Sequence, residues 1–244
     1  MYNYKLWLEY DGKSYKGWQK QKYTDNTIQE KIESSIEILL KTKIKLNVAG
    51  RTDAGVSAFG QIANFNIPLK LDPQQFTYSL NALLPDSITL KKILSVNPSF
   101  HSRYSAKKRE YIYNVTFKKK SIGRDWYYKL NGKIDFMKID QFVKFIRQQT
   151  YFRSFCKNRE DKKNFVCFIY DFRYKIVKSR DELVFRITAN RFLHSMIRAI
   201  IGCALDIGKG KIILNNIRKK IERGEKISVN YLPSTALFLN KIYY

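Results

Sequence analysis

Apolar and polar residues along the chain alternate between stretches of period two and stretches of helical period. Residues 4–10 alternate with period two and end at an Asp-Gly pair, which predicts a strand closed by a turn. From residue 27 to 41, isoleucine and leucine recur at helical spacing and predict an amphipathic helix. An Asp-Pro pair at 72–73 suits the N-cap and first turn of a second helix.

The remaining pattern completes the expected fold. Strands and helices follow the order β-α-β-β-α-β in the first half and a similar but less regular order in the second. This indicates an α+β protein with a mostly antiparallel sheet backed by helices. Residues 118–133 are basic and irregular, so we expect them to connect an N-terminal half, 1–117, to a C-terminal half, 134–244. Further strands are expected at 44–49, 61–67, 89–96, 109–117, 168–178 and 183–189, and further helices at 136–149 and 191–207.

Composition indicates a globular protein with an anionic partner. The 244 residues are 44% hydrophobic and 27% charged, which is typical of a chain that folds around a core. Lysine and arginine total 46 against 21 acidic residues, a formal charge of +25, and such an excess favours nucleic acid or an anionic membrane. Nucleic acid is favoured, because residues 1–5 lack a signal-peptide core and no run approaches ~20 apolar residues.

Cysteine and glycine patterns argue against several kinds of site. The three cysteines are widely spaced, which is typical of reduced, buried thiols in a cytosolic protein. With two histidines and no C-x-x-C pair, a zinc site is not expected, and the ligands of a zinc-dependent base deaminase are absent. The run Gly-Lys-Gly-Lys at 208–211 follows a predicted helix and lacks phosphate-loop spacing, so Gly208 is interpreted as a helix C-cap.

The most informative motif is Gly-Arg-Thr-Asp-Ala-Gly-Val at 50–56, which lies between two β-prone runs. It places an arginine, a hydroxyl and a carboxylate between flexible glycines. One interpretation is an Asx-turn, in which Asp53 bonds to its own backbone. The other is a carboxylate presented for chemistry, because phosphates would otherwise repel a negative side chain displayed by so basic a protein.

The predicted helix at 191–207 is apolar on one side and carries a narrow basic stripe on the other. That stripe has two interpretations. It is either an ordinary solvated face or the source of a guanidinium that pairs with an ionised aspartate or with phosphate. Its members are Arg191, His194, Ser195 and Arg198.

A basic and aromatic segment spans residues 103–113. In a strand, Arg109, Tyr111 and Tyr113 share one face. Aromatic faces can stack on unpaired bases while cations hold phosphates. Tyrosine is also an ordinary strand former, so both interpretations stay open.

Taken together, these residues resemble the tRNA pseudouridine synthase A family over nearly the whole chain. The motif at 50–56 is highly specific for this family when it occurs together with the other matches. Those matches are Glu9-Tyr10-Asp11-Gly12, Tyr15, Gly17-Trp18-Gln19, Gln29-Glu30, Gly60-Gln61, Asn81, Leu84-Pro85, Phe100-His101, Arg103, Ser105-Ala106, Tyr111, Asn190-Arg191-Phe192-Leu193, Met196, Arg198, Gly202, Leu237, Leu239 and Tyr243.

The resemblance implies a fold and an activity. Members of this family isomerise uridine to pseudouridine at positions 38 to 40 of the tRNA anticodon stem-loop, without cofactor or metal. They are homodimers in which two ferredoxin-like α+β halves form a continuous sheet. We therefore expect a cytoplasmic isomerase that binds tRNA and no membrane.

The resemblance also implies roles for individual residues. Asp53 corresponds to the catalytic carboxylate, and Arg51 to the residue that fills the gap left by the flipped base. Arg198 corresponds to the partner of that carboxylate. Tyr111 corresponds to the side chain stacked on the uracil, and Leu237 to an apolar wall of the pocket.

Three positions depart from the family pattern. Ser57 stands where many members have histidine, and Cys167 where arginine is usual. Both positions are expected to contact RNA. Ala236 replaces a glycine beside the pocket and is expected to tighten it slightly.

Two other functions remain as alternatives. The first is a non-catalytic RNA-binding protein that keeps the fold and the basic surface. The second is an RNA-modifying enzyme of different chemistry, such as a methyltransferase, although no glycine-rich cofactor loop follows a predicted strand.

Overall fold

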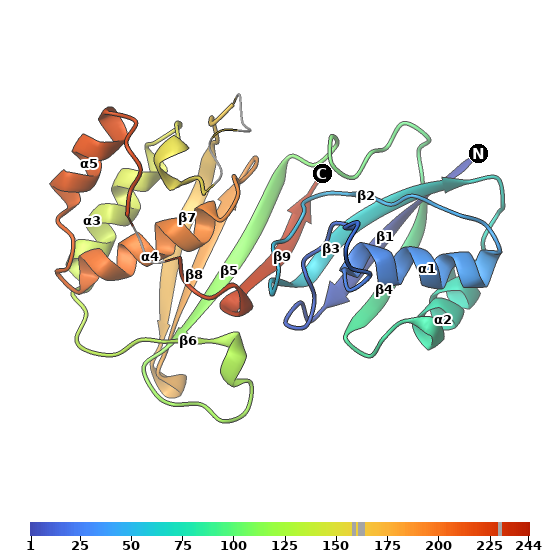
Figure 1. Ribbon diagram of the computed structural model, residues 1–244, viewed down its shortest axis with the longest axis horizontal. Coiled ribbons are helices and arrows are strands. Elements are labelled where there is room, and N and C mark those ends of the chain that lie inside the picture. Colours follow the sequence, from blue (N-terminus) through green and yellow to red (C-terminus); the bar gives the residue numbers. More distant parts are fainter. Residues whose placement is uncertain (158–159, 161–163, 229–230) are drawn as a thin grey trace. The chain divides into compact units, whose positions relative to one another are not determined.

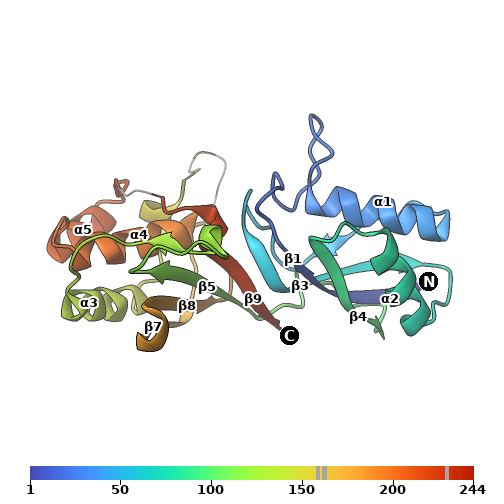
Figure 2. The same ribbon diagram turned by 90° about the horizontal axis from the view of Figure 1, so that it is seen from below.

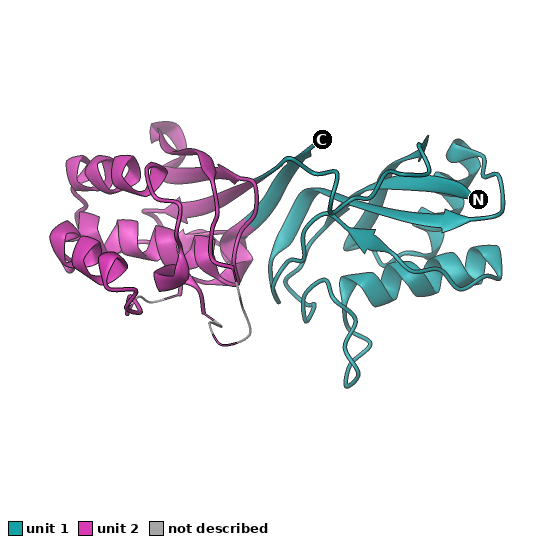
Figure 3. Ribbon diagram, turned by 90° about the horizontal axis from the view of Figure 1, so that it is seen from above, with its two compact units in different colours: residues 1–109, 238–244 teal, residues 110–237 magenta. Residues whose placement is uncertain are grey.

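The computed structural model describes residues 1–157, 160, 164–228 and 231–244. It divides into two compact units, which Figure 3 distinguishes by colour. Unit 1 comprises residues 1–109 and 238–244, and unit 2 comprises residues 110–237. The division lies at Arg109, before the expected boundary at 117, and the last strand of the chain belongs to unit 1 because it pairs there with a central strand.

Unit 1 is an α+β fold whose strands pair mostly antiparallel. Strand β1 lies between β3 and β4, and β2 pairs with the other edge of β3, all antiparallel (Figure 1). This is the split β-α-β arrangement expected for the first half. The C-terminal strand β9 joins β3 in parallel. The elements are β1 (Tyr2–Tyr10), α1 (Ile28–Leu40), β2 (Asn47–Val48), β3 (Ser57–Ile67), α2 (Pro73–Leu83), β4 (Ile88–Val96) and β9 (Leu237–Tyr243).

Local capping fixes where the helices of unit 1 begin. The Thr27 hydroxyl accepts a hydrogen bond from the main-chain N–H of Glu30, and the Asp72 carboxylate accepts one from that of Gln75. Each cap satisfies a main-chain donor that the first helical turn leaves unpaired, which is worth about 1 kcal/mol. The predicted starts of both helices are therefore confirmed.

Unit 2 repeats the alternation of strands and helices. Its strands are ordered β5-β8-β7, with β7 antiparallel to β8, and α3 contacts both α4 and β7 (Figure 2). The elements are β5 (Lys108–Thr116), β6 (Tyr128–Lys129), α3 (Phe136–Arg147), β7 (Ile169–Val177), β8 (Glu182–Ala189), α4 (Met196–Gly208) and α5 (Leu214–Glu222). The described part of this unit also contains the short 3₁₀ helices η1 (Arg124–Trp126), η2 (Arg153–Phe155), η3 (Lys178–Arg180) and η4 (Ser234–Ala236).

Residues 118–133 belong to unit 2 and do not connect the two units, contrary to the prediction. They include η1 and β6, and β6 pairs in parallel with the end of β5. The main-chain N–H of Leu130 also bonds to the carbonyl of Thr116. Many side chains of the segment are exposed, but Leu130 is buried, and Tyr128 and Lys129 pair with β5.

Helix α4 begins at Met196, five residues later than the pattern predicts. Ser195 has a φ of 56°, a left-handed conformation that a right-handed helix cannot contain. The N–H of Met196 bonds to the carbonyl of Leu193, which forms a turn before the helix. The predicted basic stripe is therefore wrong: Arg191, His194 and Ser195 precede the helix, and only Arg198 lies on it.

Gly208 is the last residue of α4 and is not its cap. A Cβ on Gly208 would lie 2.7 Å from a side-chain carbon of Ile134 and 2.9 Å from one of Ile139. Close packing therefore requires glycine at this position. The positive φ that ends such a helix occurs instead at Gly210, at 72°. Within the described residues, no helix is both long and apolar enough to span a bilayer.

Candidate active site

The motif at 50–56 forms an irregular loop between β2 and β3 in unit 1. The side chain of Arg51 is exposed, that of Thr52 is buried and that of Asp53 is half-buried. The carbonyl of Asp53 accepts a hydrogen bond from the N–H of Val56 across a tight turn, in which Gly55 has a φ of 81°. The loop therefore carries an exposed arginine and a half-buried carboxylate two residues apart.

The backbone of this loop is held by hydrogen bonds along its length. Distant segments of unit 1 supply the partners, so the loop is irregular but not loosely attached. The bonds are Arg109 Nε and Nη2 to the Ala49 carbonyl at 3.2 and 2.9 Å, Gln61 Nε2 to the Gly50 carbonyl at 2.7 Å, Trp18 N to the Thr52 carbonyl at 3.1 Å, and Gly55 N to the Tyr15 carbonyl at 3.3 Å.

Gly17 allows a neighbouring loop to lie directly against the Asp53 loop. Its φ is 95°, and a Cβ there would lie 2.9 Å from the Thr52 carbonyl oxygen and 3.1 Å from the Ala54 nitrogen. A side chain at this position would therefore be strained and would collide with backbone atoms on both sides of Asp53.

A buried polar network lies beneath the loop. The Tyr10 hydroxyl is 2.8 Å from the Thr52 hydroxyl oxygen and 3.3 Å from Nε2 of Gln61. Burial raises the pKa of Tyr10 to about 12, so the phenol stays protonated and neutral at physiological pH. The resemblance contains Tyr10 and Gln61 as motif residues but gives them no role, and the structure shows that they contact the loop.

All three departures from the family pattern are buried, so Ser57 and Cys167, which were expected to contact RNA, are not exposed in the structure. Ser57 is 3% exposed; its hydroxyl accepts a bond from the Gly12 N–H at 3.0 Å and bonds the Asp11 carboxylate at 3.3 Å. Cys167 is fully buried. Ala236, the third departure, is also fully buried in η4.

The cysteines are buried thiols, as their spacing predicts. The group comprises Cys156, Cys167 and Cys203, all of which are 0% exposed. Burial raises the pKa of the Cys203 thiol above its ordinary value, and the nearby Asp206 adds to the effect. A thiol in such surroundings is protonated and unreactive at neutral pH.

The other predicted site residues lie in unit 2. Tyr111 on β5 is buried, and its ring meets that of Phe192 edge-on, with centroids 5.3 Å apart. Arg198 on α4 is half-buried, and its Nε donates a hydrogen bond to the carbonyl of Leu232 at 2.5 Å. Leu237 follows η4 and is buried at the start of β9.

Arg198 and Tyr113 together hold the segment that precedes Leu237. The Tyr113 hydroxyl donates to the carbonyl of Pro233 at 3.0 Å, one residue after the carbonyl that Arg198 binds. Burial raises the pKa of Tyr113, and the positive charge of Arg198 offsets part of that rise. One function of Arg198 is therefore structural, because it fixes the backbone that leads to η4 and Leu237.

Part of the basic and aromatic segment at 103–113 is used in packing, while Arg103, Tyr104, Lys107 and Lys108 are exposed. The guanidinium of Arg109 donates to main-chain carbonyls of Ala49, Arg103 and Ala106. The rings of Tyr111 and Tyr113 are buried. The structure thus favours the interpretation of Arg109 and Tyr113 as framework residues.

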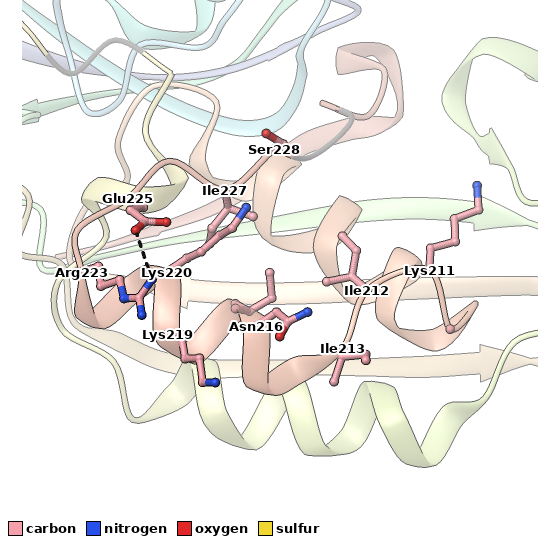
Figure 4. Close-up of a pocket in the computed structure, with 12 residues that line it drawn as sticks. Lys211, Ile212, Ile213, Asn216, Lys219, Lys220, Arg223, Glu225, Ile227 and Ser228 are labelled. Carbon is pink, nitrogen blue, oxygen red and sulfur yellow. Dashed lines mark ion pairs between the residues drawn. The ribbon is translucent and has the colours of Figure 1, made fainter.

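A basic groove of about 490 Å³ lies in unit 2 beside α5 (Figure 4). Lys211, Lys219, Lys220 and Arg223 line it, and Arg223 pairs with Glu225 at 3.7 Å. Lys211 and Lys219 lie far apart in the view of Figure 4, and the four basic side chains give the groove a positive charge.

The groove and the predicted catalytic residues occupy different positions in the chain. None of the residues that line the groove is one of the predicted site residues. Among the described residues, no three His, Cys, Asp or Glu side chains gather in a way that could hold a metal ion.

Comparison with known proteins identifies the family. A family model described as tRNA pseudouridine synthase matches residues 7–105 and 149–244. A tRNA pseudouridine synthase A of Parabacteroides distasonis is 37% identical, covering 100% of this chain and 96% of its own. Two other proteins named tRNA pseudouridine synthase A, from Thermodesulfovibrio yellowstonii and Acetivibrio thermocellus, are 34% and 36% identical, and each alignment covers 100% of both chains. Over its full length, therefore, this chain belongs to the tRNA pseudouridine synthases, a family of isomerases.

Proposed function

We propose that the protein converts uridine to pseudouridine at positions 38 to 40 of the tRNA anticodon stem-loop, with Asp53 as its catalytic carboxylate. The observation that carries this proposal is the Gly-Arg-Thr-Asp-Ala-Gly-Val loop, with its backbone hydrogen-bonded to distant segments, in a chain of this family. It presents an aspartate beside an exposed arginine, on a backbone fixed by distant segments. We place the protein in the cytoplasm, where its thiols stay reduced and its substrate is found.

The reaction needs a positioned carboxylate and little else. The N1–C1′ bond breaks, the uracil turns, and C1′ is rejoined to C5, which loses its hydrogen as a proton. Substrate and product are isomers, so the reaction requires neither oxidant nor reductant. An aspartate side chain is negatively charged at neutral pH and can either attack C1′ covalently as the uracil leaves or remove a proton from C2′, which eliminates the uracil.

The other site residues are assigned to holding the target uridine outside the RNA stack. A uridine in a helix reaches a protein carboxylate only after flipping, which costs a few kcal/mol. We propose that Arg51, which is exposed on the loop, fills the vacated space. We propose that Tyr111 stacks on the face of the uracil and that Leu237 forms an apolar wall of the pocket. Arg198 is proposed as the partner that pairs with the catalytic carboxylate.

Release of tritium tests the proposed reaction. A tRNA transcript labelled with tritium at C5 of uracil should release label to water when the protein alone is added, because the new C1′–C5 bond displaces that hydrogen. A transcript in which uridines 38 to 40 are replaced by cytidine is the matched control and should release none. Tight binding to the labelled tRNA without any release would favour the alternative of a non-catalytic RNA-binding protein.

Binding to tRNA should depend steeply on salt. The charge of +25 favours phosphate contacts, which release counterions. If about five phosphates are contacted, affinity should fall by roughly 10²–10³ between 50 and 200 mM salt. Filter binding or fluorescence anisotropy measures the slope, with a melting curve at each salt concentration to show that the protein stays folded. A flat affinity over this range would contradict an electrostatic interface.

We also propose that the protein is a homodimer, on the basis of its family. The chain mass is 28.9 kDa, so sedimentation equilibrium at micromolar concentration should give twice that mass. A single species at the mass of one chain would contradict the proposal. Adding tRNA in a second experiment distinguishes a dimer that forms only on the substrate.

A further inference from the structure

We propose that Tyr10 and Gln61 are positioning residues for the reaction, acting through Thr52 and Gly50 on the main chain that carries Asp53. The inference rests on the proposed function of Asp53. Tyr10 is the last residue of β1 and Gln61 lies within β3, so both belong to paired strands of unit 1. The loop itself has no regular structure and takes its shape from what it touches.

The hydrogens of this network can be counted. The side-chain amide of Gln61 has two hydrogens; one is donated to the Gly50 carbonyl at 2.7 Å and the other to the Tyr10 hydroxyl oxygen at 3.3 Å. The Tyr10 and Thr52 hydroxyl oxygens are 2.8 Å apart, and either hydroxyl can donate to the other. The network therefore links Gln61 through Tyr10 to Thr52.

The side chains of this network are buried, so each depends on the others for its hydrogen bonds. Gln61 is 0%, Tyr10 is 3% and Thr52 is 6% exposed, so water does not replace a missing partner without rearrangement. The raised pKa of Tyr10, about 12, keeps its hydroxyl hydrogen in place across the physiological range. Both residues bind within three positions of Asp53, on its N-terminal side.

The network complements the contacts made by the rest of the loop. The Thr52 carbonyl accepts a bond from the N–H of Trp18, and the N–H of Gly55 binds the Tyr15 carbonyl. Without the Tyr10 hydroxyl, the Thr52 side chain would lose its fixed orientation while these main-chain contacts remain. A displacement of the catalytic group by about 1 Å can lower a rate by about 100-fold without affecting the fold.

Removal of single hydroxyls tests the proposal. Tyr10→Phe keeps the ring and removes only the oxygen, and we expect kcat to fall by about 10- to 100-fold while KM for tRNA stays within about threefold. Thr52→Val should lose a similar factor, and Thr52→Ser, which keeps the hydroxyl, should recover most of it. Because Tyr10 and Thr52 share one bond, Tyr10→Phe combined with Thr52→Val should be no worse than either single change.

Tyr4→Phe is the matched control. Tyr4 lies on the same strand and is equally buried, and its hydroxyl accepts a bond from the Leu71 N–H at 2.7 Å, which is outside the Asp53 loop. Tyr4→Phe should lower the melting temperature about as much as Tyr10→Phe and leave kcat within about twofold of the wild type. Equal losses of kcat in both variants, or a wild-type kcat in Tyr10→Phe, would overturn the proposal.

Amide hydrogen exchange gives a readout that does not depend on catalysis. Exchange at residues 50–56 should be faster in Tyr10→Phe than in the wild type and unchanged in Tyr4→Phe. If the wild-type protein released no tritium from tRNA, the proposed function would fail, while exchange would still report whether Tyr10 holds the loop. Unchanged exchange in Tyr10→Phe would overturn the positioning role whatever the activity.

Discussion

Asp53→Asn should lower the rate of pseudouridine formation by roughly 10⁴-fold, which corresponds to about 5–6 kcal/mol of activation free energy. The amide has nearly the same shape as the carboxylate but is neutral, so it can neither attack C1′ nor remove a proton from C2′. The loop backbone should persist, because Arg109, Gln61 and Trp18 bond to the main-chain carbonyls of Ala49, Gly50 and Thr52 and not to the Asp53 side chain. Single-turnover rates at saturating protein measure the effect.

Affinity for tRNA distinguishes a catalytic loss from a binding loss in Asp53→Asn. Removing a negative charge from a surface that faces phosphates should leave affinity unchanged or raise it. Asp25→Asn is the matched control, because Asp25 is an exposed carboxylate of unit 1 whose pair with Lys31 spans 3.6 Å. It makes the same change in net charge and should keep a wild-type rate. A near wild-type rate in Asp53→Asn would return Asp53 to the role of a turn residue.

Gly12→Ala should destabilise the protein by about 3 kcal/mol or more, the upper range for a side chain forced into a packed site. An added Cβ would lie 2.0 Å from the carbonyl oxygen of Val56 and 2.5 Å from its carbonyl carbon. These are backbone atoms at the end of the Asp53 loop, so no side-chain rotation relieves the overlap. Differential scanning calorimetry should show a fall in melting temperature of roughly 6–12 °C.

Gly132→Ala is the control, because an added Cβ at Gly132 would meet no steric overlap. No heavy atom lies within 4 Å of a Cβ at Gly132, but its φ is 88°, so alanine there should cost only about 1–2 kcal/mol of conformational strain. Loss of activity should accompany Gly12→Ala and not Gly132→Ala. Equal stability of the two variants would show that β3 can move away from Gly12 at little cost.

The structure shows which parts of the fold can be predicted from local sequence. The starts of α1 and α2 were predictable because Thr27 and Asp72 cap their own helices within three residues. The start of α4 was not, because Ser195 adopts a positive φ without being glycine. Helix α5 was missed because Ile213 provides no side-chain cap and Ile217 is its buried residue.

The candidate site likewise has a part that can be predicted from local sequence and a part that cannot. The Asp53 loop was predictable because an unusual set of residues is consecutive in the chain. The network that supports it was not, because Tyr10 and Thr52 are 42 positions apart and Tyr10 and Gln61 are 51 apart. The burial of Ser57 likewise follows from a contact with Gly12, 45 positions away. Pairing of β1 with β3 creates these contacts, and no local pattern indicates them.

Position-resolved mapping of pseudouridine tests the central claim most directly. A tRNA transcript with uridines at 38, 39 and 40 would be incubated with the wild-type protein and, in parallel, with Asp53→Asn, and every uridine would be assayed for conversion. We expect pseudouridine at these positions with the wild-type protein, none with Asp53→Asn, and comparable binding of tRNA by both. Conversion by Asp53→Asn at a wild-type rate, or conversion confined to uridines outside the anticodon stem-loop, would contradict it.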